Sequence, residues 1–428
     1  MQKYLPDPFL FAIILTFVVF LMGWGLTDSG PADMVKHWGT GFWSLLAFSM
    51  QMILILVTGF VLANSPIFKK LLSLIAGIAK SPGQGIMLVG FVSAIASFIN
   101  WGFGLVIGAL LAKEVARKIE NVHYPLLIAT AYMGFLVWHA GFAGSVPLTI
   151  AGDKHFLVDQ IGVIPTTETI FAPFNLIIAG ALLIIIPIVA RFMMPSKEDT
   201  FTIDRNLLNE SETAAAAETV KTPAEKLENS WIISVLTALL GFVYIFFYFS
   251  DKGFAGLNLN IVIFIFLFLG ILLHFRPINF LDSLKEAIKG SAGIAIQFPF
   301  YAGIMGMMVA SGLAGVISDW FVSFSNEVTL PLFTFLSAGI VNFFVPSGGG
   351  QWAVQGPVMM PAALELGADT AKVAMSVAWG DAWTNMIQPF WALPALGIAG
   401  LKAKDIMGYT TMALLISGVV IALGLVIF

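Results

Sequence analysis

The sequence predicts an all-α membrane protein with about nine full spans, arranged as two inverted repeats. Three observations lead to this prediction. Hydrophobic residues make up 58% of the chain and charged residues only 11%, whereas an ordinary soluble chain is about 25% charged. Apolar stretches near the length that a helix needs to cross a bilayer, about 20 residues, recur along the sequence. The same series of polar features also appears once in each half.

The apolar stretches supply the predicted spans. Seven of them are close to one crossing each: 9–26, 41–63, 169–190, 231–250, 254–275, 291–318 and 406–428. Four are longer: 83–112, 124–152, 328–364 and 373–401. We interpret 83–112 and 328–364 as re-entrant hairpins, which enter and leave the membrane by one face. Nine spans then remain, with the N-terminus inside and the C-terminus outside. No small-residue cleavage site follows the first stretch, so we expect a retained helix rather than a signal peptide.

The basic residues support this topology, because cytoplasmic loops carry an excess of lysine and arginine. Of the 21 basic residues, 17 fall on the predicted inner side. The four on the outer side are Lys36, Lys154, Lys252 and Lys372. Making either hairpin a true crossing would reverse everything after it and remove the asymmetry.

A polar segment divides the chain into two membrane repeats. Residues 195–229 are rich in Ala, Glu, Thr and Lys, with no aromatic residue between Phe201 and the end of the segment. Such a composition favours a disordered or loosely helical cytoplasmic linker. We therefore expect a first repeat at 1–194 and a second at 230–428. The linker is interpreted as a tether, with a regulatory loop as the alternative.

The two repeats contain the same parts in the same order. Each has a span with a central glutamine, Gln51 or Gln297, and a hairpin follows after 49 positions at Asn100 and 47 at Phe344. Each hairpin precedes a long span with a polar middle, at 133–141 and 379–386. The predicted topology places the first hairpin inside and the second outside. An inverted repeat of this kind is the usual plan of secondary transporters.

The hairpin tips are the strongest candidates for a binding site. The second tip contains Pro346 and the run Ser347, Gly348, Gly349, Gly350 and Gln351. Proline ends the incoming helix, the glycines allow close approach of a ligand, and a helix restarting near Gln351 would direct free N–H groups at an anion. Ser347 could cap that helix. The first tip, at Asn100, Trp101 and Gly102, is the predicted counterpart.

Few ionisable groups lie inside the predicted spans, and such groups are functional candidates because they are costly in hydrocarbon. Asp381 is the only acid well inside a span, and His139 the only deep histidine. Asp381 could bind a cation or carry a proton, and His139 could sense protons. Both could instead be structural hydrogen-bonding groups. Thr384 and Asn385 follow Asp381 closely and could face the same site.

Other classes of protein are excluded or disfavoured. The chain has no cysteine, so it has neither disulfides nor thiolate chemistry. It has no phosphate-binding loop and no hydrolase motif, so we expect neither an ATP-driven pump nor an enzyme. A net charge of −4 argues against a nucleic-acid partner. We expect no cofactor and no metal site, apart from Na⁺ at the hairpin tips or H⁺ as a coupling ion.

Two motifs resemble a known family. Residues 343–357, FFVPSGGGQWAVQGP, and residues 379–385, WGDAWTN, resemble the bacterial short-chain fatty acid transporters, and the likeness extends over essentially the whole chain. That family is grouped with C4-dicarboxylate and citrate carriers. The resemblance implies paired re-entrant hairpins, a homodimeric scaffold and elevator-type movement of the hairpin unit.

The resulting hypothesis is a symporter in the bacterial inner membrane. It would import acetoacetate- or butyrate-type monocarboxylates with a cation. The substrate would bind at Asn100–Gly102, Ser347–Gln351 and Thr384, with Asp381, Asn385 and His139 coupling the ion. No Lys or Arg lies in the middle of a span, which favours one carboxylate over two. The alternatives are a carrier for another organic anion, such as a C4-dicarboxylate, and a cation/proton antiporter.

Overall fold

The computed structural model describes residues 8–196, 198–203, 222–343 and 345–428. Helices account for 79% of the structure, and no strand occurs in this described part of the chain. The all-α prediction is therefore confirmed. Lys3 and most of the predicted linker lie outside the described residues.

The first half contains a helical hairpin, α5–α6, followed by an interrupted span, α7–η1–α8, among its helices. They are α1 (Pro8–Leu26), α2 (Pro31–Gly41), α3 (Leu46–Ala63), α4 (Pro66–Ala76), α5 (Pro82–Ile99), α6 (Trp101–Lys118), α7 (Tyr124–Met133), η1 (Gly134–Ala140), α8 (Ser145–Ile150), α9 (Val158–Ile161) and α10 (Pro173–Phe192).

The helices of the second half start with a short helix in the linker. They are α12 (Pro223–Glu228), α13 (Trp231–Lys252), η2 (Phe254–Gly256), α14 (Leu259–Leu273), α15 (Pro277–Lys289), α16 (Ala292–Ala310), α17 (Leu313–Phe324), α18 (Leu330–Val341), α19 (Gly348–Leu366), α20 (Thr370–Thr384), η3 (Asn385–Ile387), α21 (Pro389–Ala399) and α22 (Ala403–Ile427).

Seven helical segments in the described residues are long and apolar enough to cross a membrane: α3, α5, α7–α8, α10, α13, α16 and α22. Six of them match predicted spans. Two further predicted spans correspond to shorter apolar helices, Ala12–Leu26 within α1 and Leu259–Leu273. The ninth is the interrupted α20–η3–α21. The seventh, α5, falls in the stretch 83–112, where the sequence predicts a re-entrant hairpin; by length and hydropathy alone α5 could also cross.

The first hairpin turns at a single residue. Asn100 has an extended backbone (φ −159°, ψ 128°) and is both the C-cap of α5 and the N-cap of α6. Its side-chain oxygen accepts a hydrogen bond from the Phe103 N–H at 3.0 Å. That bond satisfies one of the free donors of the new helix, so α6 begins immediately after the turn.

The second hairpin turns over a longer segment. Helix α18 ends at Val341 and α19 begins at Gly348. Ser347 is extended (φ −157°, ψ 116°), and its hydroxyl oxygen accepts from the Gly350 N–H at 3.4 Å. The predicted cap is therefore present. The helix begins three residues earlier than the predicted restart near Gln351, because the three glycines are its first turn.

Both long polar spans are interrupted, as the sequence predicts. In the first half α7 tightens into the 3₁₀ segment η1 and ends at Gly141. The Phe142 N–H there donates to the Phe98 carbonyl of α5 at 2.7 Å. A Cβ on Gly141 would collide with that carbonyl, so only glycine allows this approach. In the second half η3 separates α20 from α21.

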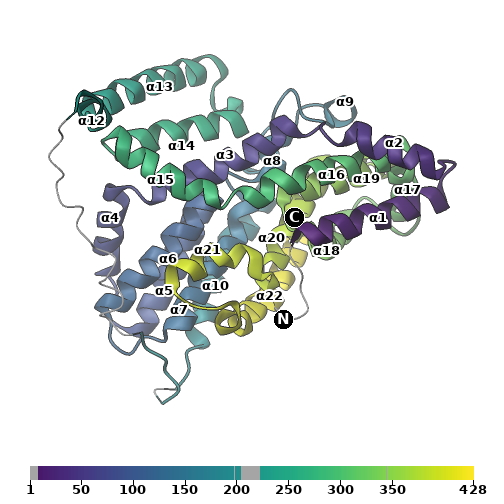
Figure 1. The fold of residues 1–428 in the computed structure, drawn as a ribbon. Coiled ribbons are helices and arrows are strands. Elements are labelled where there is room, and N and C mark those ends of the chain that lie inside the picture. Colours follow the sequence, from purple (N-terminus) through teal and green to yellow (C-terminus); the bar gives the residue numbers. More distant parts are fainter. Residues whose placement is uncertain (1–7, 197, 204–221, 344) are drawn as a thin grey trace.

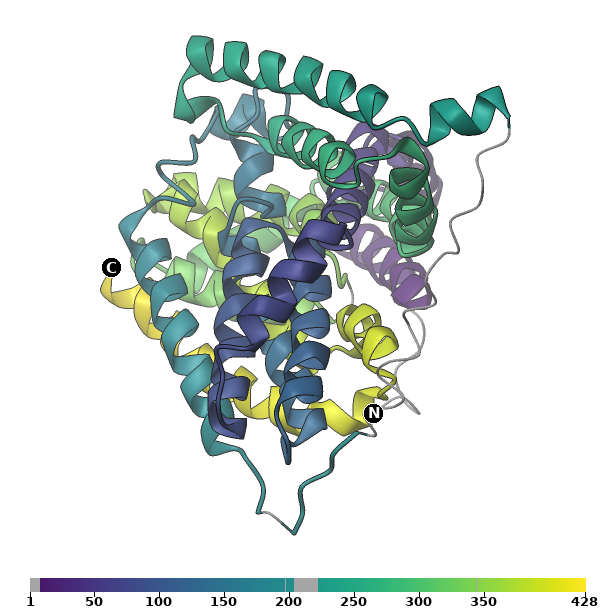
Figure 2. The same cartoon turned by 90° about the vertical axis from the view of Figure 1, so that its left-hand side faces the viewer.

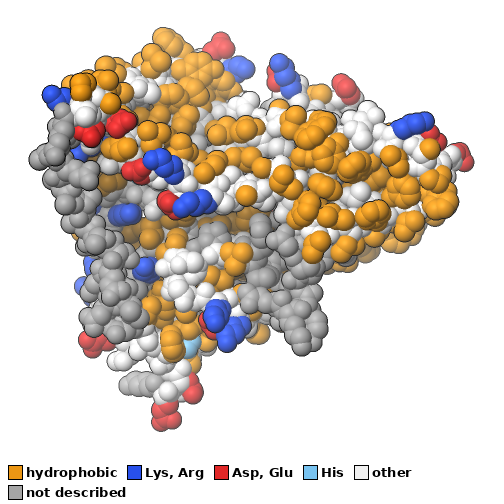
Figure 3. Space-filling view, in the orientation of Figure 1, with side chains coloured by type: hydrophobic (Ala, Val, Ile, Leu, Met, Phe, Trp, Pro, Cys, Tyr) orange, Lys and Arg blue, Asp and Glu red, His pale blue; other side chains and the backbone are white. Residues whose placement is uncertain are grey.

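The outer surface is apolar, as expected for contact with lipid. Helix α13 lies at the edge of the molecule over α14 (Figures 1 and 2). Only 17% of its most apolar 18-residue window is buried. Apolar side chains cover the lobe formed by α1, α16 and α17 (Figure 3), where Phe17, Val309 and Trp320 are exposed. The interrupted span of the first half lies inside, because 94% of the most apolar 18-residue window of α7–α8 is buried.

Candidate functional site

The two interrupted spans meet at a buried histidine–aspartate contact. His139, in η1, and Asp381, in α20, are both fully buried, and His139 Nδ1 lies 3.0 Å from Asp381 Oδ2. The Val146 N–H donates to the other ring nitrogen, Nε2, at 3.2 Å. Because an N–H can donate only to an unprotonated nitrogen, the ring proton lies on Nδ1 and is donated to the carboxylate. Asp381 is therefore held by one fixed donor.

Amide groups extend this contact to the second hairpin. Asn342 follows the last residue of α18, and its Nδ2 donates to the Asp381 carbonyl at 2.8 Å and to Thr384 Oγ1 at 2.9 Å. Gln388 Nε2 donates back to the Asn342 carbonyl at 2.5 Å. The break of the second hairpin and the break of the second span are thus joined by hydrogen bonds.

Aromatic residues extend the contact to the first repeat. Trp138 Nε1 donates to Asn385 Oδ1 at 3.1 Å. The Trp138 ring stacks on His139 at 4.1 Å between centroids and lies 5.9 Å from Trp101, the first residue of α6. Trp101 also contacts Trp391 of α21 edge to face, at 5.3 Å. These rings form an apolar wall beside the His139–Asp381 contact.

The glycines of the second tip are needed for close approach. A Cβ on Gly348 would collide with His139 Cε1 and lie 2.8 Å from Trp138 Cη2. A Cβ on Gly349 would lie 2.7 Å from Phe48 Cζ of α3, and one on Gly350 would lie 2.5 Å from Tyr301 Cδ2 of α16. None of the three has a positive φ. Their role is therefore space rather than an unusual backbone angle.

Three of the predicted site residues are directed away from the His139–Asp381 contact. Gln351 Nε2 donates to the Ala338 carbonyl of α18 at 2.8 Å and to Gln355 at 3.0 Å, within its own hairpin. Asn100 Nδ2 donates to the Ile55 carbonyl of α3 at 3.4 Å. A Cβ on Gly102 would lie 2.9 Å from the Leu56 carbonyl. The structure thus gathers Trp101, His139, Gly348, Asp381, Thr384 and Asn385, whereas Gln351, Asn100 and Gly102 contact neighbouring helices.

Several buried polar atoms around the pair lack a hydrogen-bond partner in the described structure. The oxygens are Asp381 Oδ1, Asn342 Oδ1 and Gln388 Oε1. The donors are Asn385 Nδ2 and Trp101 Nε1. An unsatisfied buried polar group costs about 1–3 kcal/mol. Such a concentration of them indicates a site that a polar ligand or ion completes.

Sequence reasoning did not place Asn342 or Trp138 in the candidate site. Asn342 directly follows an apolar helix and stands four residues before Pro346, and Trp138 directly precedes His139. Each is a polar or amphipathic side chain next to a predicted interruption of a helix, and this signal could have identified both. No group of three His, Cys, Asp or Glu side chains that could hold a metal ion occurs among the residues described. A cation here would use amide, hydroxyl and single carboxylate oxygens.

Paired hairpins and two interrupted spans around one buried acid, in a chain of membrane-spanning helices, are the parts of a secondary membrane transporter. The chain belongs to the short-chain fatty acid transporter family, whose model matches residues 1–428. It is a multi-pass membrane protein of a transporter family, and neither the family nor its relatives are enzymes.

Similar proteins cover the whole chain. A protein of Escherichia coli (strain K12) named "Putative short-chain fatty acid transporter" is 48% identical over 428 residues, which is 100% of this chain and 97% of that protein. A Haemophilus influenzae protein of the same name is also 48% identical, over 99% and 96% of the two chains. Among solved structures, the YdaH transporter of Alcanivorax borkumensis superposes with a TM-score of 0.62 at 15% identity, over 99% and 97% of the two chains. That likeness concerns the fold.

Proposed function

We propose that this protein imports short-chain monocarboxylates of the acetoacetate and butyrate type across the bacterial inner membrane, in symport with Na⁺. The observation that carries the proposal is the His139–Asp381 contact between the two interrupted spans. Around it lie unsatisfied oxygens suited to a cation and unsatisfied N–H groups suited to a carboxylate.

The choice of cation follows from the unsatisfied oxygens. His139 occupies Asp381 Oδ2, which leaves Oδ1 as a buried anionic oxygen. Asn342 and Gln388 each bond through their NH₂ group and leave their carbonyl oxygens unpaired. A proton would satisfy only one of these oxygens, whereas a Na⁺ could satisfy several together. We therefore favour Na⁺, with H⁺ on Asp381 as the alternative.

The choice of substrate follows from charge and from the aromatic wall. Asp381 and His139 are the ionisable groups of the site, and none of the basic residues in the described chain lies beside them. A bound Na⁺ would offset the charge of Asp381, and the N-terminus of α19 would attract one carboxylate. Trp101, Trp138 and Trp391 would contact a short alkyl chain. A second carboxylate would find no partner there.

Uptake into proteoliposomes tests the proposal. Pure protein is reconstituted, Na⁺ or H⁺ gradients are imposed separately, and entry of radiolabelled butyrate, acetoacetate and succinate is measured against protein-free vesicles. Saturable butyrate uptake driven by Na⁺ supports the proposal. Uptake driven only by H⁺ would mean that protonation of Asp381, rather than Na⁺ binding, couples transport. Uptake of succinate alone would mean that the substrate is a dicarboxylate. Proton–sodium exchange without any organic anion would indicate an antiporter.

Two further expectations are part of this proposal. Residues 1–194 and 230–428 would act as two repeats of opposite membrane orientation. The protein would work as a homodimer, which light scattering of the detergent-solubilised protein can test. A monomeric mass after subtraction of the detergent would refute the expected homodimer and would leave the transport proposal unaffected.

A further inference from the structure

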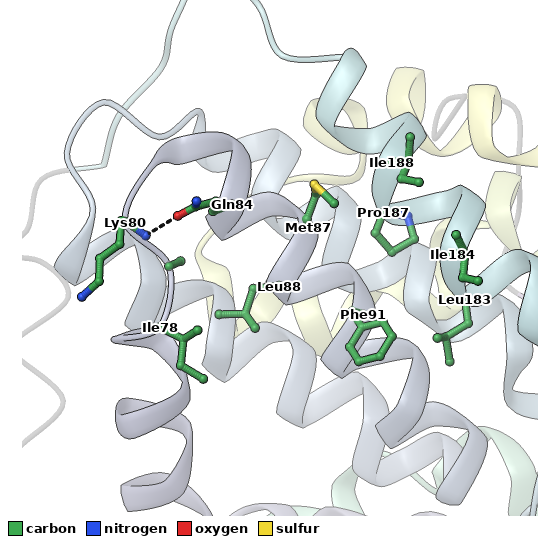
Figure 4. Close-up of a pocket in the computed structure, with 11 residues that line it drawn as sticks. Ile78, Lys80, Gln84, Met87, Leu88, Phe91, Leu183, Ile184, Pro187 and Ile188 are labelled. Carbon is green, nitrogen blue, oxygen red and sulfur yellow. Dashed lines mark hydrogen bonds between the residues drawn. The ribbon is translucent and has the colours of Figure 1, made fainter.

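A cavity lies on the outer surface, away from the His139–Asp381 contact. It is a groove of about 510 Å³ between α5 and α10, closed at one end by the segment between α4 and α5. This volume is within the range of small-molecule sites, about 300–1,000 Å³. Figure 4 shows its walls: Met87, Leu88 and Phe91 come from α5, and Leu183, Ile184, Pro187 and Ile188 from α10. The walls are almost wholly apolar.

One end of the groove is strongly basic. Lys80 and Gln84 lie at that end, opposite Phe91 and Leu183 (Figure 4). Arg191, near the end of α10, reaches across to α5: its Nη1 lies 3.6 Å from Met87 Sδ, and a Cβ on Gly83 would lie 3.3 Å from its Nε. Two cations, one from the α4–α5 connection and one from α10, therefore lie at the same end of the apolar groove.

A third cation lies close to these two. Lys80 Nζ donates to the Gly77 carbonyl at 3.3 Å, and a Cβ on Gly77 would lie 3.6 Å from Lys118 Nζ. The two ammonium groups thus share one neighbouring residue. Within the described residues no acidic side chain lines the groove or forms an ion pair with Lys80 or Arg191. The positive potential at this end is not neutralised.

The position of the basic end matches a membrane surface. Lys80, Lys118 and Arg191 belong to the predicted inner side. Helix α4, which leads into the groove, exposes an apolar stripe at Ile67, Leu71 and Leu74, and the exposed Ile78 follows two residues after its end. This is the pattern of a helix lying in the membrane interface. An apolar channel that starts at the interface and has cations at its mouth suits a molecule with an anionic head and an acyl tail.

We propose that this groove binds an anionic phospholipid of the cytoplasmic leaflet, with its phosphate at Lys80 and Arg191 and one acyl chain between α5 and α10. Basic pockets between membrane helices on this side of the membrane bind acidic head groups. Because α5 is an arm of the first hairpin, the lipid would contact the transport machinery directly.

Native mass spectrometry of the purified full-length protein tests the proposal. Phosphatidylglycerol is titrated against the wild type and the double variant Lys80→Gln/Arg191→Gln. Each basic residue near a membrane surface contributes about a fivefold factor in affinity, so the double variant should bind about thirtyfold more weakly. The matched control is Lys285→Gln/Lys289→Gln, which removes two exposed lysines of α15 on the same predicted side. That control should bind like the wild type.

Two further ligands and one variant separate the contributions of head group and tail. Phosphatidylcholine with the same acyl chains should bind weakly, because its head group carries no net charge. Glycerol phosphate should also bind weakly, because it has no tail. Filling the groove with Ile184→Trp, at an exposed position, should weaken phosphatidylglycerol while the basic residues remain.

The proposal is overturned by any of four results. These are equal affinity of the wild type and the Lys80/Arg191 variant, equal binding of the two phospholipids, glycerol phosphate binding as tightly as the lipid, and dodecanoate binding more tightly than phosphatidylglycerol. The last two would identify a soluble phosphate site and a site for fatty carboxylates, respectively.

Discussion

His139 Nδ1 and Asp381 Oδ2 lie 3.0 Å apart, although 242 residues separate them in the chain. The contact joins the interrupted span of one repeat to that of the other, and Gly348 at the second hairpin tip packs directly on the imidazole ring. Any movement of one repeat against the other must keep or break this contact. It is therefore the natural place to test coupling.

Replacement of Asp381 by Asn should abolish cation-driven uptake. The amide keeps the size of the side chain but removes the charge that would hold Na⁺, so we expect uptake at least about a hundredfold lower, the loss of about 3 kcal/mol of interaction. Radiolabelled butyrate uptake at equal protein level is the measurement. Glu365→Gln, at an exposed position on α19, removes a matched acid and should leave uptake unchanged. Wild-type uptake by Asp381→Asn would refute the assignment.

Gly348→Ala should block transport by filling space. The added methyl group would overlap His139 Cε1 and approach Trp138, and neither ring can retreat because both are buried. We expect at least about a tenfold loss of uptake, equivalent to about 1.4 kcal/mol. Gly397→Ala in α21 is the control, since nothing lies within 4 Å of its Cβ position. Equal uptake by the two variants would mean that the tip tolerates displacement.

Asn342→Ala should change the Na⁺ dependence of uptake more than the choice of substrate. Its Oδ1 is one of the unpaired oxygens near Asp381, so its removal should raise the Na⁺ concentration needed for half-maximal uptake by about tenfold, or about 1.4 kcal/mol. The ratio of butyrate to acetoacetate uptake should stay constant. Asn64→Ala, on the surface end of α3, is the control. An altered substrate ratio with unchanged Na⁺ dependence would place Asn342 at the substrate instead.

His123 should make the start of the linker sensitive to pH. Its Nδ1 accepts from the Phe201 N–H at 3.0 Å, and its Nε2 lies 3.0 Å from the Tyr409 hydroxyl. Burial lowers the pKa of His123 below its usual value, about 6.5. The neutral form is thus favoured in the folded protein, and its stabilising effect is present above that value and lost as the pH falls through the lowered pKa. Protonation would place an N–H against the Phe201 N–H.

Hydrogen exchange of residues 198–203 measures this effect. We expect slow exchange at pH 7.5 and faster exchange at pH 5, after correction for the intrinsic rate. In His123→Ala the segment should exchange fast at both pH values. His155, whose pKa burial also lowers, provides the control variant His155→Ala, which should keep the wild-type response. Identical pH profiles for His123→Ala and the wild type would contradict the prediction.

The hydropathy pattern was enough to predict the long apolar helices and both interruptions, but not the short helices α2 and α15. Long uncharged stretches divided by Gly, Pro or Asn cannot form one continuous span, because backbone groups inside the bilayer must find partners. Asp381 and His139 were also predictable, since isolated ionisable groups in such stretches are rare. Their direct contact was not, because it depends on how two distant spans pack.

The direction of each tip side chain was decided by tertiary structure. In a helix that is apolar on all sides, the sequence contains no periodic signal for which face turns inward. Gln351 follows Ser347 by four residues, yet its side chain donates a hydrogen bond to α18 rather than facing the His139–Asp381 contact. Asn100 caps α6 and contacts α3. Asn342, an isolated amide by sequence, links Asp381 to Thr384.

By itself the sequence determined the class of protein, its family and the segments that bend inside the membrane, because these follow from composition, spacing and motif. Which polar groups share one site was decided only by the packing of the two repeats. The rotation of each helix about its axis is set by close approaches such as Gly348 on His139 and Gly141 on Phe98. Those contacts arise between segments far apart in the chain, where no local pattern can specify them.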